Sequence, residues 1–294
     1  MSFDNVYEAI TEENDETRWA YGTGFADPLA GVDTALPAGV PGADLAAYCL
    51  MLGDDALVMS HRLQEWCARA PELEDEVALA NIALDLLGQA RLLLSRAGYA
   101  EGGGRDEDAL AFLRGEREYR NVRLVEAANG DFAQSVARLL VFATWRLALL
   151  SRLVTSADPV LAAIADKGVK EVTYHRDYAA RWLVRLGDGT TESHRRAQAG
   201  LAAVWPLVAE LFEPHPVEAA LAAVGVAVDP AGLRAEFDAV LDQVLDAATL
   251  ARPQVAAQAG VSGRAGRHGV HTEAMGFLLA EMQSVARAHP DATW

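Results

Sequence analysis

The segment from Pro71 to Leu94, PELEDEVALANIALDLLGQARLLL, constrains the fold more than any other part of the chain. Its apolar residues fall on nearly every side of a helix. The one narrow polar line consists of Asn81, Asp85 and Gln89 at i, i+4 and i+8. A helix that is apolar all round is typical of one enclosed by other elements. We therefore expect the polar line to find partners inside the protein, because burying an unpaired amide or carboxylate costs about 1–3 kcal/mol.

Helical periodicity covers most of the chain from residue 44 onward. Pro71 starts the helix described above, and the run Gly102–Gly104 ends it. Asp131 and Asp158, the latter followed by a proline, are start signals for two more long helices. We predict long helices over 44–66, 71–97, 131–153 and 158–186, short ones within 106–126, and further helices over 192–212 (kinked at Pro206), 229–251 and 272–288.

The predicted elements define the fold class. No segment alternates apolar and polar residues between hairpin turns, so the sequence predicts no sheet. Four long helices with short connections favour an all-α, up-down helical bundle with additional helices. Residues 1–40 differ, with an acidic run and a Gly/Pro-rich stretch, and predict an N-terminal extension that is partly disordered or docked on a partner through Trp19, Tyr21 and Phe25. Residues 41–294 form the helical domain.

Charge and cysteine content exclude several classes of protein. The formal net charge of −17, spread along the chain, argues against nucleic-acid binding, which needs a concentrated basic face. We find no run of about 18 purely apolar residues to span a bilayer, and no basic and apolar leader typical of an export signal. The two cysteines, Cys49 and Cys67, lie too far apart for a disulfide if one helix carries both. We therefore expect a cytoplasmic protein.

A bundle of this kind invites comparison with di-iron carboxylate proteins, in which two helices each supply a Glu and two each supply a Glu-x-x-His. The third long helix argues against such a site, because residues 132–152 contain no Asp, Glu or His. In the second helix, Gly88 stands three residues after Asp85, where a histidine would be required. The fourth helix has Glu171 and His175 at i, i+4 spacing, and Lys167 lies one turn before Glu171 on the same face. Two readings of Lys167 and Glu171 stay open: an ordinary surface i,i+4 pair, and an ammonium that occupies the electrostatic role of a lost cation.

We predict a vestigial centre whose polar residues are Asn81, Asp85, Gln89, Lys167, Glu171 and His175. If Asp85 is buried opposite Lys167 or an arginine, its removal would leave a charge unpaired. The first helix adds Asp54, His61 and Glu65 on one face. Two readings of this face stay open: a solvated or partner-facing stripe, and a set of metal ligands.

A Gly/Arg-rich loop, AGVSGRAGRHG, precedes the last helix. Backbone amides and arginines in such a loop can bind phosphate, although no strand and no GxxxxGK[ST] motif accompany it. The alternatives are a structural or partner-contacting loop and a phosphate-binding one. Its candidate residues are Arg264, Arg267, His268, His271 and Glu273.

Six strings of residues carry a resemblance to a known family. They are EWCARAPELE (65–74), PELEDEVALANIALDLLGQAR (71–91), NGDFAQSVAR (129–138), KEVTYH (170–175), WLVRLGDGT (182–190) and HTEAMGFLLAEMQ (271–283). Over residues 44–294 the chain closely resembles the C subunits of bacterial ring-1,2-phenylacetyl-CoA epoxidases. The first 40 residues are not covered by it.

The resemblance implies a ferritin-like bundle that has lost its di-iron centre and has no catalytic residues and no metal of its own. It also implies a non-catalytic partner of the catalytic A subunit, which carries the di-iron centre, in a complex with a small B subunit. A reductase containing flavin and an iron–sulfur cluster supplies electrons from NADPH, and the Gly/Arg-rich loop becomes a candidate contact for the phosphates of coenzyme A. The alternative is that the chain itself is a di-iron oxygenase acting on an aromatic acyl-CoA through His61, Glu65, Asp85, Glu171 and His175.

Overall fold

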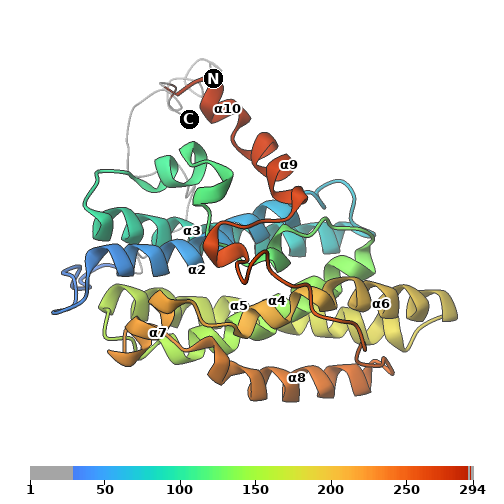
Figure 1. Ribbon diagram of the computed structural model, residues 1–294. Coiled ribbons are helices and arrows are strands. Elements are labelled where there is room, and N and C mark those ends of the chain that lie inside the picture. Colours follow the sequence, from blue (N-terminus) through green and yellow to red (C-terminus); the bar gives the residue numbers. More distant parts are fainter. Residues whose placement is uncertain (1–28, 291, 293–294) are drawn as a thin grey trace, which may run out of the picture.

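The computed structural model describes residues 29–290 and residue 292. The acidic run and the three aromatic residues of the predicted extension therefore lie outside the described residues. The four longest helices of the described part are α2 (Gly42–Gln64), α3 (Leu73–Glu101), α4 (Phe132–Leu153) and α5 (Pro159–Gly187). Helices α2 and α3 pack as one antiparallel pair, and α4 and α5 as another (Figure 1). The predicted all-α, ferritin-like bundle is confirmed.

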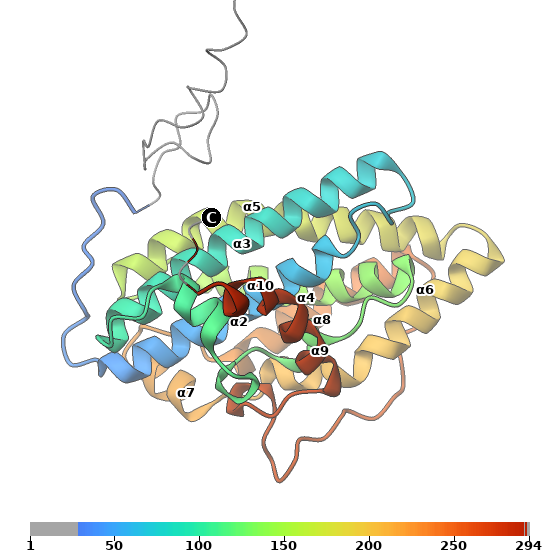
Figure 2. The same cartoon turned by 90° about the horizontal axis from the view of Figure 1, so that it is seen from above.

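Shorter elements cover the two helix pairs. They are α6 (Thr191–Val204), α7 (Pro216–Ala223), α8 (Arg234–Ala247), α9 (Glu273–Met282), α10 (Ser284–Ala288) and the single turns η1 (Ala109–Leu113), η2 (Glu116–Glu118), η3 (Arg123–Glu126), η4 (Trp205–Leu207), η5 (Ala209–Phe212), η6 (Pro230–Leu233) and η7 (Gly266–His268). Helices α6 and α8 contact α4 and α5, whereas α9 contacts η2 and η3 (Figures 1 and 2). The chain therefore returns at its C-terminal end to cover the loops between the two helix pairs.

Local sequence signals account for the ends of the long helices. The Asp131 side chain accepts a hydrogen bond from the Gln134 amide at 3.0 Å, and the Asp158 side chain accepts one from the Leu161 amide at 2.9 Å. Pro159 occupies the first turn of α5, where its missing N–H costs nothing. Gly102 ends α3 with a left-handed φ of 70°. The starts of α4 and α5 lie within one residue of the predicted ones, whereas α3 ends at Glu101, four residues beyond its predicted end.

Other predicted boundaries were wrong. Helix α6 ends at Val204 and gives way to 3-10 turns rather than continuing with a kink, because Pro206 has no N–H for the helical ladder. The segment 106–126 contains a π turn and two 3-10 turns, not α-helices. A 3-10 turn likewise occupies 230–233, so α8 begins at Arg234. Cys67 lies beyond the end of α2, and both cysteines are free thiols.

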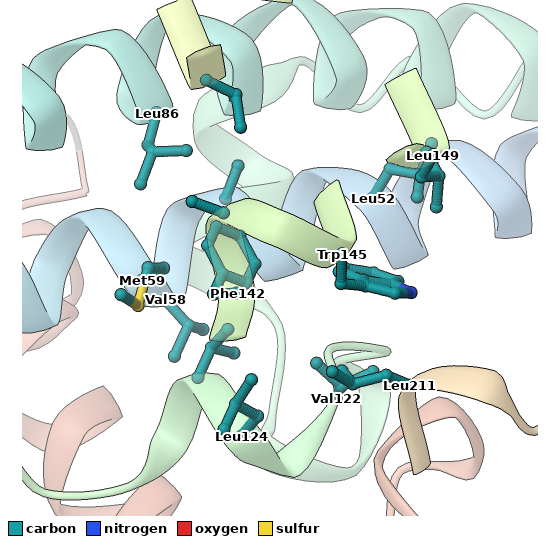
Figure 3. Close-up of a cluster of buried hydrophobic side chains, with 14 of the residues drawn as sticks. Leu52, Val58, Met59, Leu86, Val122, Leu124, Phe142, Trp145, Leu149 and Leu211 are labelled. Carbon is teal, nitrogen blue, oxygen red and sulfur yellow. The ribbon is translucent and has the colours of Figure 1, made fainter. Parts of the chain in front are cut away.

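The helix enclosed on nearly every side is α4, not α3. Side chains of α4, among them Phe142 and Trp145, lie at the centre of the core with Leu52, Met59 and Leu86 (Figure 3). On α3, by contrast, an outer face remains exposed. Apolar residues on all sides of a helix thus do not establish that every side is buried, because periodicity does not show what covers each face.

In the part of the chain that the structure describes, one helix, α3, is long and apolar enough to cross a membrane. Core helices of soluble proteins pass the same test. Here α3 packs against α2 and α5 along its inner face.

A buried ion pair joins the two helix pairs at one end of the bundle. Arg96 of α3 donates to the Asp158 carboxylate at 2.6 and 3.2 Å, and the two side chains are 2% and 0% exposed. The same guanidinium donates to the carbonyls of Thr34 and Ala35. Arg96 therefore holds the segment before α2, the start of α5 and helix α3 together.

We expect Arg96→Met to lower the free energy of unfolding by about 3–5 kcal/mol, because the substitution leaves the buried Asp158 carboxylate without its counter-charge. Urea unfolding measures the loss. The matched control is Arg91→Met on the same helix, where Arg91 pairs with Glu107 but is 71% exposed, and there the change should stay within about 1 kcal/mol. Equal effects of the two substitutions would contradict the role of Arg96.

Candidate functional site

Three helices contribute polar side chains to the middle of the bundle. Arg146 of α4 donates from Nε to Oε1 of Gln89 on α3 at 2.9 Å. Gln89 in turn donates from Nε2 to Oε2 of Glu171 on α5 at 2.8 Å. Arg146 and Gln89 are 0% and 3% exposed, so this chain of hydrogen bonds lies in the interior. One residue of the polar line on α3, Gln89, therefore has the interior partners that the sequence predicts.

Lys167 and Glu171 form an ion pair one turn apart on α5. Lys167 Nζ lies 3.5 Å from Glu171 Oε1, and the two side chains are 39% and 14% exposed. The Glu171 carboxylate thus bridges the interior amide of Gln89 and an ammonium at the rim. The pair was predicted from the spacing. Only the fold shows that its carboxylate also extends the interior network.

Asp85 and His175 form a second pair closer to the surface. His175 Nε2 lies 3.0 Å from Asp85 Oδ2, and the side chains are 1% and 37% exposed. The condition of a buried Asp85 opposite Lys167 or an arginine is not met: its partner is an imidazole and more than a third of the side chain is exposed. Asn81 is exposed. At 100° per residue, each four-residue step turns the polar line by about 40°, so it winds from solvent at Asn81 to the interior at Gln89.

The cation at the centre of the bundle is Arg146, which a search for metal ligands alone does not reveal. Besides Gln89, its guanidinium donates to the Leu52 carbonyl at 3.2 Å. Burial lowers the pKa of Arg146 to about 10, and the group remains charged at neutral pH. Arg138, eight residues earlier on α4, is buried as well. The available signal in the sequence was that Arg138 and Arg146 lie in the interior of a largely apolar helix that has no acidic residue.

The residues at this centre do not fit a di-iron centre. A guanidinium occupies the place where α4 would supply carboxylates, and its positive charge opposes binding of two further cations. The Glu171 carboxylate is already engaged by Gln89 and Lys167. Within residues 29–290 and 292, no three His, Cys, Asp or Glu side chains gather where they could share a metal ion.

The residues proposed as an alternative metal site are dispersed. Glu65 accepts hydrogen bonds from Arg62 at 2.7 Å and from the Asn129 side chain at 2.9 Å. Burial lowers the pKa of His61, whose charged neighbours are Glu65, Arg62 and Glu281 of α9. The sequence places Asp54 on one helix face with His61 and Glu65. In the structure Asp54 is buried rather than solvated and pairs with Arg114. Within the alternative set, His61 and Glu65 are neighbours on α2 and a hydrogen bond joins Asp85 to His175, but the two pairs use different partners and do not meet at one metal position.

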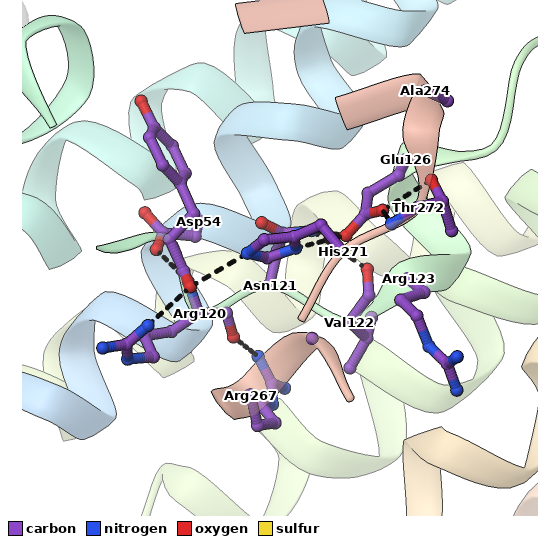
Figure 4. A network of polar contacts seen from close by, with 12 residues as sticks. Asp54, Arg120, Asn121, Val122, Arg123, Glu126, Arg267, His271, Thr272 and Ala274 are labelled. Carbon is purple, nitrogen blue, oxygen red and sulfur yellow. Dashed lines mark hydrogen bonds and ion pairs between the residues drawn. The ribbon is translucent and has the colours of Figure 1, made fainter. Parts of the chain in front are cut away.

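The Gly/Arg-rich loop is divided between interior and surface. The Arg267 guanidinium is buried and donates to the Asp55 carboxylate at 3.0 and 2.8 Å and to the Met51 carbonyl. Figure 4 shows Arg267 and His271 within one network of polar contacts. His271 Nδ1 lies 2.6 Å from Glu126 Oε1, with both side chains 0% exposed. The other three candidates, Arg264, His268 and Glu273, are exposed. Arg267 and His271 thus make buried contacts within the protein.

Adjacent acids on α2 organise these loops. Asp54 accepts from the Arg114 guanidinium and from the Arg120 amide, whereas Asp55 holds Arg267 and the Val122 amide. Burial raises the pKa of Asp55, and the neighbouring Arg267 opposes that rise. The role of Asp55 could not be predicted from the sequence, because its partner lies more than 200 residues away and no local spacing indicates the pair.

We expect Arg146→Met to lower the free energy of unfolding by about 1–3 kcal/mol, because Gln89 Oε1 and the Leu52 carbonyl lose their donor while the volume is nearly kept. Thermal and urea unfolding measure this. The control is Arg181→Met on α5, where Arg181 is 79% exposed and pairs with Asp177, and there stability should change by less than about 1 kcal/mol. A fully stable Arg146→Met protein would show that the interior network carries no stability.

The His271–Glu126 pair predicts a pH dependence of stability. Burial alone lowers the pKa of His271, but the hydrogen bond and charge of Glu126 raise it above the ordinary 6.5. A raised pKa in the folded state gives a stabilisation that is complete below the unfolded pKa and is lost as pH rises through the folded one.

The stability difference between wild type and His271→Gln should therefore shrink from about pH 5.5 to about pH 8.5. Urea unfolding at both pH values measures it, and comparison with the variant cancels the contributions of the other histidines. A difference that grows with pH would contradict the pairing.

Comparison with known proteins agrees with this architecture. The family described as "Phenylacetic acid catabolic protein" matches residues 37–294. The C subunit of the 1,2-phenylacetyl-CoA epoxidase of Escherichia coli (strain K12) is 48% identical over 250 residues, which cover 85% of this chain and 99% of that protein. The resemblance seen in the six strings is confirmed. This chain belongs to the phenylacetic acid catabolic protein family.

Proposed function

We propose that this chain is the structural, non-catalytic subunit of a multicomponent phenylacetyl-CoA 1,2-epoxidase, in the aerobic degradation of phenylacetate. In this proposal it binds and supports a homologous catalytic A subunit that carries the di-iron centre. One observation carries the proposal: α4, which would supply metal-binding carboxylates in a di-iron bundle, instead places the buried guanidinium of Arg146 at the centre. The similarity to a protein named as the C subunit of such an epoxidase supports it.

The proposal extends to the other components. A small B subunit joins the assembly, and a reductase with flavin and an iron–sulfur cluster passes electrons from NADPH to the catalytic subunit. This chain needs no cofactor of its own for that role. A cytoplasmic location belongs to the same proposal and is supported by the two free thiols.

The outer face of α3 is the surface we assign to the catalytic partner. Its apolar side chains Leu73, Val77 and Leu84 are 71%, 52% and 57% exposed, and their spacing of four and seven residues places them in one stripe. Leu87 continues the stripe, and Tyr174 of α5 is also exposed. A contiguous apolar stripe on a surface helix is typical of a protein–protein interface. A second helical bundle presents the complementary shape.

In this role the interior groups of the chain act as positioning elements. The network of Arg146, Gln89 and Glu171 connects three helices, and the Arg96–Asp158 pair joins α3 to the start of α5 at one end of the bundle. These contacts hold α3 and α5 in a fixed relation. A rigid α3–α5 face lets the catalytic subunit bind without reordering either helix, which reduces the entropy cost of association.

One observation favours a second candidate, a di-iron oxygenase in its own right: the Asp85–His175 pair lies near Glu171 on the same side of the bundle. The nearby Tyr178 hydroxyl, however, donates to Asp75 at 3.0 Å. Iron content separates the two functions. We expect the isolated chain to contain far less than one iron per chain, and its complex with the catalytic subunit to contain the di-iron centre.

Glu171→Ala provides a second measurement of the same question. The complex containing this variant should retain epoxidation activity, because the carboxylate holds no metal in the proposed role. Stoichiometric di-iron in the isolated chain, or joint loss of iron and activity in Glu171→Ala, would establish the second candidate instead.

We expect Leu84→Glu to weaken binding of the catalytic subunit by about tenfold or more, because a carboxylate would be buried in an apolar contact. Co-purification and calorimetric titration of the two subunits measure this. Val224→Glu is the matched control, since Val224 is also 57% exposed but lies at the end of α7. Equal affinity for both variants, with unchanged melting temperatures, would exclude the α3 face as the interface.

A further inference from the structure

The exposed part of the Gly/Arg-rich loop is held in place by buried ion pairs on both sides. Before it, the Arg123 guanidinium donates to the Gln258 and Ala259 carbonyls at 3.0 and 3.2 Å and to Glu210 at 2.6 Å. After it, the amide of Gly266 donates to the same Glu210 at 3.0 Å, and the buried pair of Arg267 with Asp55 follows. The exposed side chain of Arg264 lies between these anchors and that of His268 directly follows the second one, so both stand on a backbone that buried contacts hold in place.

A tight turn presents the first of these side chains, Arg264. The backbones of Val261 and Arg264 exchange hydrogen bonds of 2.9 and 3.0 Å, and Ser262 and Gly263 between them have φ values of 53° and 73°. Two successive positive φ values are typical of a type I′ turn, which closes a two-residue hairpin. Arg264 thus leaves the turn in a defined direction.

The second exposed side chain, His268, lies against another imidazole. The ring centroids of His268 and His215 are 4.7 Å apart. His215 caps α7, and its Nδ1 accepts a hydrogen bond from the Val217 amide at 3.2 Å. Because Nδ1 is the acceptor, the neutral imidazole of His215 carries its proton on Nε2 and offers a donor there at any pH.

Three arginines, Arg120, Arg264 and Arg267, place positive charge near this imidazole pair, and one carboxylate, that of Glu218, accepts a hydrogen bond from the His215 amide at 2.9 Å. Burial lowers the pKa of His268, and the charges of Arg264 and Arg120 lower it further. Arg120 uses Nη1 for the carbonyls of Arg117 and Tyr119. Among residues 29–290 and 292, no carboxylate forms an ion pair with Arg117, Arg120 or Arg264. These arginines therefore form a local positive patch on a chain whose formal net charge is −17.

We propose that Arg120, Arg264, His268 and the Nε2–H of His215 bind a phosphate dianion, either inorganic phosphate or the phosphate group of a phosphorylated metabolite. Guanidinium groups match phosphate oxygens with paired N–H donors, and two imidazoles add single donors at a tetrahedral anion. The site shares no residue with the vestigial centre or with the α3 face. It stands or falls independently of the proposed function.

The experiment is calorimetric titration of the full chain with inorganic phosphate at constant ionic strength. The double variant Arg264→Ala/His268→Ala should bind about tenfold more weakly or worse, since each charged hydrogen bond contributes on the order of a tenfold factor. The matched control, Arg69→Ala/His289→Ala, removes one exposed arginine and one exposed histidine elsewhere and should bind phosphate like the wild type.

A second measurement uses the unaltered protein. Phosphate should shift the imidazole NMR signals of His215 and His268 but not that of His289. Titration with a small phosphate monoester then distinguishes the sources: tighter binding of the ester assigns a phosphorylated metabolite, and equal binding assigns free phosphate. The proposal is overturned by equal effects of chloride, by unshifted His215 and His268 signals, by undiminished binding in the double variant, or by affinity for an acidic peptide without affinity for phosphate.

Discussion

The arrangement of the bundle depends on one buried cation, the guanidinium of Arg146. A charge in the interior is tolerated only if hydrogen bonds and opposite charges surround it. Gln89 and the Leu52 carbonyl supply the hydrogen bonds, and Glu171 lies one hydrogen bond further on. Helices α2, α3 and α5 are thereby fixed around α4. In a di-iron carboxylate bundle the metal would connect the helices, whereas here one arginine does so.

The same principle extends to the loops. Carboxylates that could have been ligands instead pair with arginines from distant segments, as Asp54 does with Arg114 and Asp55 with Arg267. Because breaking a buried pair leaves an uncompensated charge, each pair specifies one arrangement of the loop it holds. A scaffold that has to present a fixed surface to a partner needs such specificity. The exposed stripe lies on α3, which the buried Arg96–Asp158 pair joins to the start of α5.

Features encoded by neighbouring residues were predictable. Helix caps act within three or four residues, so Asp131 and Asp158 indicate in the sequence itself where two helices begin. The lack of ligand residues on α4 was equally visible in the sequence. The extent of the shorter helices was not, since 3-10 turns and α-helices share the same starting signals. Nor was the exposure of α3 predictable, because periodicity measures composition around a helix and not what covers it.

The sequence by itself determined the helical class of the chain, the positions of its long helices and its resemblance to a known family. Only the tertiary structure decided which polar groups meet: Asp85 with His175 at the rim, Arg146 with Gln89 inside, and Arg267 buried while Arg264 is exposed. The physical reason is the separation along the chain over which each kind of contact acts. Backbone hydrogen bonds and caps join residues close in sequence, whereas these contacts join segments brought together only by packing of the bundle.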